Sequence, residues 1–179
     1  MKTIKIISLV ILSIFALSAC KSARDKSIEQ ISILEKELIS STTKIDSVKA
    51  QQLIDLYINY ADQFKNDSIT PIFLFKAADI SMNIMKPMQS IDLLNKVMLN
   101  YPDFTKAPDC LFLKAFIYEN QTHELEKAEK AYNEFLQKYP NNEFAPSAKA
   151  SVENLGVPIE TLIKSFENKN KIAKDSLKS

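Results

Sequence analysis

Glycine is almost absent from this chain, with one residue among 179. Phosphate-cradling loops, nucleotide-binding turns and tight β-hairpins all use backbone conformations that glycine adopts at least cost. The sequence therefore excludes the usual glycine-rich binding loops and favours a helical fold. Seven prolines then mark helix boundaries, because proline fits the first turn of a helix and breaks its interior.

Side chains that carry catalysis or bind metals are also few. The chain has two cysteines, no tryptophan and a single histidine, His123, which lies in the polar segment 120–124. A Ser-His-Asp triad, a Cys-His pair or a histidine-based metal site would all depend on that one ring. The sequence therefore predicts that the protein is not an enzyme and that it has no metal and no cofactor.

An excess of one charge is lacking as well, since the formal net charge is +1. Proteins that bind nucleic acids normally carry a basic excess clustered on one face, so no nucleic-acid partner is expected. The hydrophobic fraction of 46% is that of a globular protein able to form a core. A chain of this length has room for one domain of ordinary size with appendages.

The N-terminus has the pattern of an export signal, in which two lysines precede an uncharged run at 6–19. This run is shorter than the roughly 20 apolar residues that a helix needs to cross a bilayer. We therefore expect a signal peptide at 1–19. The run ends in Leu17-Ser18-Ala19-Cys20, which resembles the lipobox of bacterial lipoproteins. The resemblance implies cleavage before Cys20 and acylation of that cysteine, and more than one acyl chain gives stable anchoring.

Acylation of Cys20 leaves Cys110 without a partner for an intramolecular disulfide. We expect Cys110 to be a small apolar side chain buried in a helix. The residues after Cys20 are lysine and serine, without the aspartate that commonly retains bacterial lipoproteins at the inner membrane. The lipoprotein resemblance therefore implies an outer-membrane location, facing the periplasm.

Two short segments follow the anchor. Residues 20–26 are polar and basic, and we expect a lipidated tether that lifts the folded part off the membrane. In the segment 27–48, Ser27 and Gln30 fit a capping box, and apolar residues then recur at spacings of three and four. This segment predicts either an N-terminal helix that packs on its own domain or a short coiled coil through which copies associate.

An internal repeat occupies much of the region 49–168. A shift of 38 residues places Ala77 on Ala115, Leu94 on Tyr132 and Pro102 on Pro140. Aromatic and proline residues recur with a drift of one residue, at Phe64, Tyr101 and Tyr139 and at Pro71, Pro108 and Pro146. A period of this length with two helices per unit indicates a solenoid of helical hairpins, with about seven or eight helices in all.

Further residues are predicted to mark the ends of helices. Ser68, Thr105 and Asn142 are the expected N-caps. Gly156 is placed where the end of a helix needs a left-handed residue. We expect a disordered basic tail at 169–179.

The second repeat has side chains of characteristic size at fixed positions. The first helix has a large, a small and an aromatic residue, and the second has a small residue, an aromatic and a terminal proline: Leu111, Ala115, Tyr118, Ala128, Tyr132 and Pro140. The 38-residue shift assigns Phe73, Ala77, Ile80, Ser90, Leu94 and Pro102 to the same places in the first repeat. The pattern resembles a tetratricopeptide repeat, in which small residues allow two helices to cross closely.

The period is longer than the 34 residues usual in that family. This departure resembles a subgroup of envelope proteins, the tetratricopeptide lipoproteins of outer-membrane protein assembly and the periplasmic repeat protein associated with the Tol-Pal system. The resemblance covers roughly residues 50–168 and implies an all-α, tetratricopeptide-like solenoid of helical hairpins with an N-terminal helix.

The same resemblance implies a groove for a partner, because the first helix of each repeat lines a concave face in this family. The groove positions are apolar in both repeats: Leu74, Phe75, Ala78, Phe112, Leu113 and Phe116. The family's clamp for a peptide C-terminus needs lysine and asparagine there, so that mode is not expected. An apolar groove must be covered, either by the N-terminal helices of the chain itself or by an apolar segment of a partner.

Two functional hypotheses follow. The first is a membrane-anchored adaptor or scaffold that binds another envelope protein, by resemblance in outer-membrane protein assembly or envelope maintenance. The alternative is a structural or cell-division-coordinating periplasmic protein that forms homo-oligomers through residues 27–48.

Overall fold

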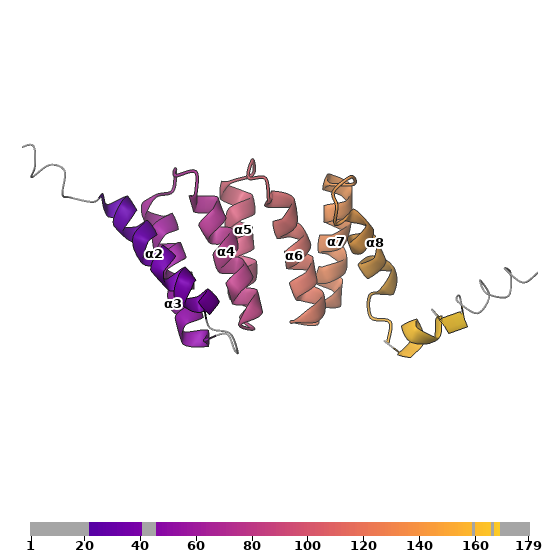
Figure 1. Cartoon of the computed structure of the whole chain (residues 1–179). Helices are drawn as coiled ribbons and strands as arrows, with labels where there is room; N and C mark the ends of the chain where they lie inside the picture. Colours follow the sequence, from indigo (N-terminus) through magenta and orange to yellow (C-terminus); the bar gives the residue numbers. More distant parts are fainter. Residues whose placement is uncertain (1–21, 41–45, 159, 166, 169–179) are drawn as a thin grey trace, which may run out of the picture. The chain divides into compact units, whose positions relative to one another are not determined.

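A computed structural model describes residues 22–40, 46–158, 160–165 and 167–168. These residues form helices joined by turns and contain no strand, so the predicted all-α class is confirmed (Figure 1). The labelled helices are α2 (Ala23–Ser40), α3 (Ser47–Gln63), α4 (Thr70–Asn83), α5 (Pro87–Asn100), α6 (Ala107–Asn120), α7 (Leu125–Lys138) and α8 (Ala145–Asn154), and residues 160–165 and 167–168 are helical as well. The predictions for the signal peptide, Cys20 and the tail 169–179 fall outside the described residues.

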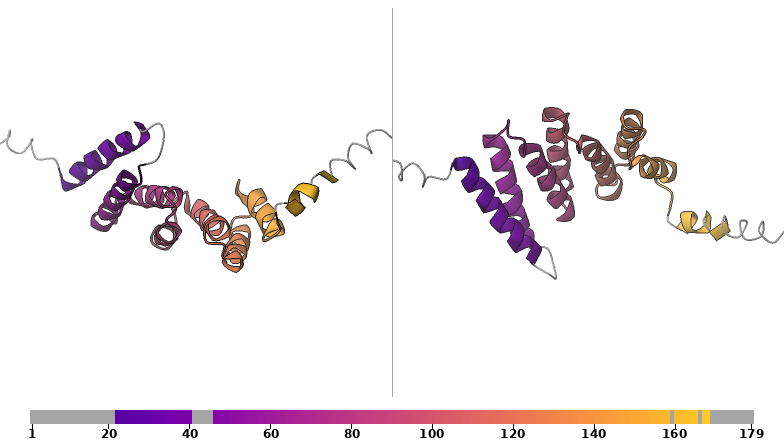
Figure 2. Two further views of the ribbon diagram at one scale, coloured as in Figure 1. Left: turned by 90° about the horizontal axis from the view of Figure 1, so that it is seen from below. Right: turned by 45° about the horizontal axis from the view of Figure 1, so that its top comes forward.

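The chain divides into two compact units at Ala77 and Ala78, inside α4. The first unit contains α2, α3 and the first half of α4. The second unit contains the rest of α4 and the helices up to α8, of which α6, α7 and α8 are successive neighbours (Figure 2). None of the helices in the described ranges is both long enough and apolar enough to span a membrane.

In the first unit α2 lies antiparallel to α3, because Arg24 near its start pairs with Asp67 after α3 and Glu37 near its end pairs with Lys49. The buried face of α3 consists of Ala50, Leu53, Ile54, Tyr57, Tyr60 and Ala61. Phe73 of α4 packs on the rings of Tyr57 and Tyr60, with centroids 5.0 and 4.9 Å away. The helices α3 and α4 therefore share one aromatic core.

The predicted boundaries at the N-terminus are wrong. Ser22, not Ser27, caps α2, because its hydroxyl accepts a hydrogen bond from the backbone N–H of Asp25 (3.1 Å) and donates to the Asp25 carboxylate (2.8 Å). Ser27 lies inside the helix and donates to the carbonyl of Ala23. Residues 23–26, predicted as tether, are therefore helical.

The segment 27–48 is not one helix either, since α2 ends at Ser40 and Val48 belongs to α3. The carboxylate of Asp46 accepts hydrogen bonds from the N–H groups of Val48 and Lys49 and so starts a new helix. In the described part of the segment, α2 packs on α3 of its own chain.

The turns between hairpins confirm the predicted repeat. Phe64, Tyr101 and Tyr139 end α3, α5 and α7 with nearly the same φ (−123°, −136° and −133°), and each donates its N–H to the carbonyl four residues earlier. Two further backbone hydrogen bonds recur in all three turns. Each turn then leads to a helix whose second residue is proline: Pro71, Pro108 and Pro146.

The predicted N-caps Thr105 and Asn142 are wrong, because Lys106 and Phe144 occupy the N-cap positions of α6 and α8 and neither makes a side-chain capping hydrogen bond. The side chain of Asn142 instead accepts from the N–H of Phe144 (2.9 Å) within the turn before α8. At the first turn Asp67, not Ser68, plays this part, because its carboxylate accepts from the N–H of Ile69 (3.1 Å).

The drift of one residue comes from the turns within the hairpins. Residues 84–86 join α4 to α5, whereas 121–124 join α6 to α7. Met85 and His123 occupy the left-handed region in these turns, with φ of 58° and 55°. Because the second turn is one residue longer, Pro87 of α5 and Leu125 of α7 are 38 apart, whereas Thr70 of α4 and Ala107 of α6 are only 37 apart.

This difference corrects the predicted register of α4. Leu74 and Ala78, not Phe73 and Ala77, correspond to Leu111 and Ala115 of α6. The correspondence agrees with burial and with a close helix crossing, because the buried hydroxyl of Ser90 donates to the carbonyl of Ala78 (2.7 Å).

The single glycine behaves as predicted. Gly156 follows α8 with φ +73°. A Cβ atom there would lie 3.3 Å from the side chain of Leu125, which adds a packing constraint to the conformational one.

Candidate partner-binding surface

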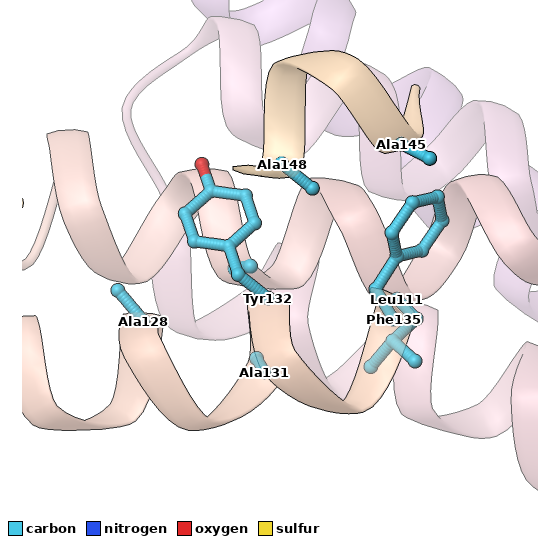
Figure 3. Packing of buried hydrophobic residues seen from close by; sticks show 8 residues of the cluster. Leu111, Ala128, Ala131, Tyr132, Phe135, Ala145 and Ala148 are labelled. Atoms are coloured by element: carbon cyan, nitrogen blue, oxygen red, sulfur yellow. The ribbon is translucent and has the colours of Figure 1, made fainter. Parts of the chain in front are cut away.

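The second unit has an apolar core that fixes α6, α7 and α8 against one another. Its members are two aromatic residues, one leucine and five alanines: Leu111, Ala115, Ala128, Ala131, Tyr132, Phe135, Ala145 and Ala148. Figure 3 shows Ala148 and Ala145 of α8 next to the rings of Tyr132 and Phe135 of α7. Alanine at these places lets α8 approach the rings closely. The predicted packing roles of Leu111, Ala115, Ala128 and Tyr132 are therefore confirmed.

Phe112 lies at the edge of this core and is held by three rings. Its centroid is 4.8 Å from that of Phe144 in a stacked arrangement, 5.7 Å from Tyr132 and 5.6 Å from Phe135. It is the rigid base of the candidate surface, partly covered by the same unit.

Phe116 lies one helical turn further along α6 and is 38% exposed, whereas Leu113 is half-buried. Residues four apart share a helix face, so Phe112 and Phe116 form one apolar strip on α6. We call Phe112, Leu113 and Phe116 the α6 strip.

The groove predicted on α4 is largely wrong. Leu74 is 3% exposed and Ala78 is fully buried, so neither lines an open groove, while Phe75 is half-buried. The cause is the register, because the residues of α4 that correspond to Leu113 and Phe116 are Lys76 and Asp79. The equivalent face of α4 is therefore mixed in character and not uniformly apolar.

Lys76 has partners inside the first unit. Its ammonium nitrogen lies 2.7 Å from Glu35 of α2 and 6.0 Å from the ring centroids of Tyr57 and Phe73. Tyr57 of α3 donates a second hydrogen bond to Glu35. Burial opposes ionisation of Glu35, but these hydrogen bonds outweigh it and hold its pKa below the usual range.

Asp67 forms a second polar cluster at the turn between α3 and α4. It receives the Arg24 guanidinium, the Tyr60 hydroxyl (2.8 Å) and the Ile69 N–H (3.1 Å). The Arg24 hydrogen bond, followed by those from Ile69 and Tyr60, holds the pKa of Asp67 well below its usual range. Burial and the bond to Asp67 raise the pKa of Tyr60 to about 12.

Sequence reasoning missed both polar clusters. Arg24 and Asp67 are 43 residues apart, and no periodic pattern connects them. Lys76 and Tyr57 fit ordinary helix patterns that give no hint of Glu35 as a common partner.

Among the described residues, cysteine and histidine side chains occur at Cys110 and His123, and neither belongs to the α6 strip. Cys110 is buried, as predicted, and burial raises the pKa of its thiol to about 12. His123 is exposed in the turn before α7. Within the described ranges, no group of three or more His, Cys, Asp or Glu side chains is arranged to hold a metal ion.

A comparison with protein families matches residues 109–142 to the tetratricopeptide repeat. The match covers nearly all of α6, all of α7 and the turn after it, which is the unit with the aromatic and alanine core. A search of curated proteins found no match. The match and the helical hairpins support a tetratricopeptide repeat in this chain, and repeats of this kind suggest a role in protein–protein interaction.

Proposed function

We propose that this protein is a membrane-anchored adaptor that binds an apolar segment of another envelope protein on the α6 strip. The observation that carries the proposal is the exposure of Phe116, at 38%, beside the half-buried Leu113 and the fixed ring of Phe112. Aromatic side chains on a rigid base dominate many protein interfaces, because they bury a large area at low entropic cost.

The α6 strip suits an extended or helical segment with one or two large apolar side chains. Phe144 stacks on Phe112 within the second unit, so the Phe112 ring is already covered by a residue of this chain. Phe116 remains available to a partner.

The anchor is the acylated Cys20 that the lipobox resemblance implies. The same resemblance supports an outer-membrane location facing the periplasm and a task in outer-membrane protein assembly or envelope maintenance. A binding role needs no catalytic group, metal or cofactor, and nucleic acid is not a partner in this proposal.

Photocrosslinking in intact cells tests the proposal. A photoreactive amino acid replaces Phe116 in one variant and Leu99, an 81% exposed residue of α5, in a control. We expect one heterologous envelope protein to be captured from position 116, identified by mass spectrometry, and much less of it from position 99. Capture of this chain alone from position 116, or equal capture from both positions, would contradict the proposal.

Self-association through α2 is the second candidate, and exposed Ile33 and Ile39 are the observation that favours it. Light scattering of the purified protein with and without residues 27–48 tests it. Oligomers that persist without the segment would exclude this candidate.

A further inference from the structure

The distance along the chain between the proposed anchor and the folded part is very short. Lys21 is the only residue between Cys20 and Ser22, whose side chain caps α2. From Cys20 to Ala23, the first helical residue, three residues at about 3.5 Å each span about 10 Å at most. The segment expected to act as a spacer is itself part of the helix.

The start of α2 is also fixed to the rest of the first unit. The Arg24 guanidinium pairs with both carboxylate oxygens of Asp67, which is 14% exposed and also bonded by Tyr60 and Ile69. The Arg24–Asp67 pair therefore attaches the N-terminus of α2 to the turn 64–69. We call the first turn of α2 together with this turn the anchor end.

We infer that the anchor end of the acylated protein rests directly on phospholipid headgroups, with no spacer between membrane and fold. The inference rests on the proposed acylation of Cys20. The acyl chains hold Cys20 at the edge of the hydrocarbon core, and the headgroup layer beyond it is roughly 5–8 Å thick. A link of about 10 Å leaves α2 starting within or just outside that layer.

The charges of the anchor end suit an anionic surface. Lys26 and Lys65 belong to it and Lys21 precedes it in the sequence, against the acidic residue Asp25. Arg24 and Asp67 neutralise each other. A lysine near an anionic bilayer contributes about 1 kcal/mol of attraction, so the surface charge favours the same orientation as the short link.

The opposite end of α2 provides an internal reference. It lies near Ser40, where Glu37 pairs with Lys49 across the helix pair (2.9 Å). The 18 residues of α2 extend over about 27 Å. A helix of this length that begins at the headgroups and points away from them places its two ends at clearly different distances from the bilayer.

Fluorescence quenching on vesicles tests the inference with the acylated, full-length mature protein. Asn66→Cys and, separately, Ser40→Cys are labelled with a fluorophore. The buried Cys110, with its raised pKa, does not compete for the label. The vesicles contain phosphatidylethanolamine, phosphatidylglycerol and a phospholipid with a nitroxide on its headgroup. We expect quenching at position 66 to be several-fold stronger than at position 40.

An inserted linker provides the matched test of the short link. About twelve Gly and Ser residues between Lys21 and Ser22 have an end-to-end distance of roughly 20 Å. We expect this insertion to reduce quenching at position 66 to the level of position 40, and the same insertion after Asn168 to leave it unchanged. Arg24→Ala should act in the same direction as the first insertion by releasing α2 from the turn.

The inference and the proposed function fail in different ways. A mature protein without the mass of acyl chains, or one that does not float with vesicles, contradicts the proposed anchor. The inference alone is overturned if the protein is acylated and floats with vesicles, but quenching at position 66 equals that at position 40. It is also overturned if the N-terminal insertion leaves quenching at position 66 unchanged.

Discussion

The packing of α2 in the first unit and the packing of α7 in the second are stabilised by different interactions. Ile31 is the only buried residue of α2, whereas α7 buries Ala128, Ala131, Tyr132 and Phe135. The contacts of α2 with its neighbours include hydrogen-bonded charges, namely Arg24 with Asp67 and Glu35 with Lys76. In the second unit, ion pairs such as Lys138 with Glu134 join residues of the same helix.

Because of this difference, α2 and α7 should respond to different perturbations. Apolar burial depends little on pH, and its loss through a cavity is costly. Partly exposed ion pairs contribute less, are screened by salt and depend on the ionisation of their partners. The attachment of α2, next to the proposed anchor, should therefore depend on pH and salt. The packing of the repeat that carries the α6 strip should depend on them much less.

The largest effect is expected from Phe135→Ala in the core of the second unit. The side chain is fully buried, so the change should lower the free energy of unfolding by about 3–5 kcal/mol. Denaturant unfolding followed by circular dichroism measures it, with the exposed Leu99→Ala as a control that should change stability by less than about 0.5 kcal/mol. A loss below about 1 kcal/mol would remove the contrast between the units.

A fall in pH should loosen α2 before it affects α7. Glu35 and Asp67 both have a pKa below their ordinary values of 4.5 and 3.8, so their ionised forms stabilise the folded state. That contribution is complete above the ordinary pKa values and is lost as pH falls below them toward the lower folded values.

Hydrogen exchange of backbone amides at pH 6 and near pH 3 measures this difference, after correction for the intrinsic rate. We expect protection in α2 to fall while protection in α7 is retained. Equal losses in both helices would show that the polar clusters do not hold α2.

Particular residues show how far the sequence predicts this structure. The aromatic C-caps and the prolines at second helical positions identified the hairpin boundaries, because each has a local backbone role. The register of α4 was not predictable in the same way, because the run from Pro71 to Phe75 is apolar on all sides and defines no face. The turn 121–124 has one extra residue, so the shift of 38 that aligns α5 with α7 misaligns α4 with α6 by one residue. That misalignment wrongly assigned Leu74 and Ala78 to the groove.

The start of α2 was missed for a related reason. Ser22 and Asp25 form a local capping pair inside a segment whose polar composition is typical of a tether. Phe116, in contrast, was assigned to a groove by the resemblance to the tetratricopeptide repeat, and it is the exposed member of the α6 strip.

Removal of one tyrosine hydroxyl in each unit should show how far each helix pair depends on a polar contact. Tyr57 and Tyr132 each donate to a carboxylate of the preceding helix, Glu35 and Glu119 respectively. Tyr57→Phe and Tyr132→Phe should each cost about 1 kcal/mol, since a buried hydrogen bond is lost without a change of shape. Hydrogen exchange should then show loss of protection in α2 for Tyr57→Phe, but little change in α6 for Tyr132→Phe. Loosening of α6 to the same degree would contradict the idea that apolar packing alone suffices there.

The smallest effect is expected at the turn that sets the longer period of the second unit. His123 is held at φ 55°, a left-handed conformation that costs a non-glycine residue roughly 1–2 kcal/mol. His123→Gly removes this cost but adds backbone freedom to the unfolded chain, worth about 0.5–1 kcal/mol. The net result should be a gain of about 0.5 kcal/mol in thermal or denaturant unfolding. Met85→Gly, at the matching turn with φ 58°, should give a similar gain, and a loss at both turns would mean that their side chains contribute contacts that outweigh the backbone strain.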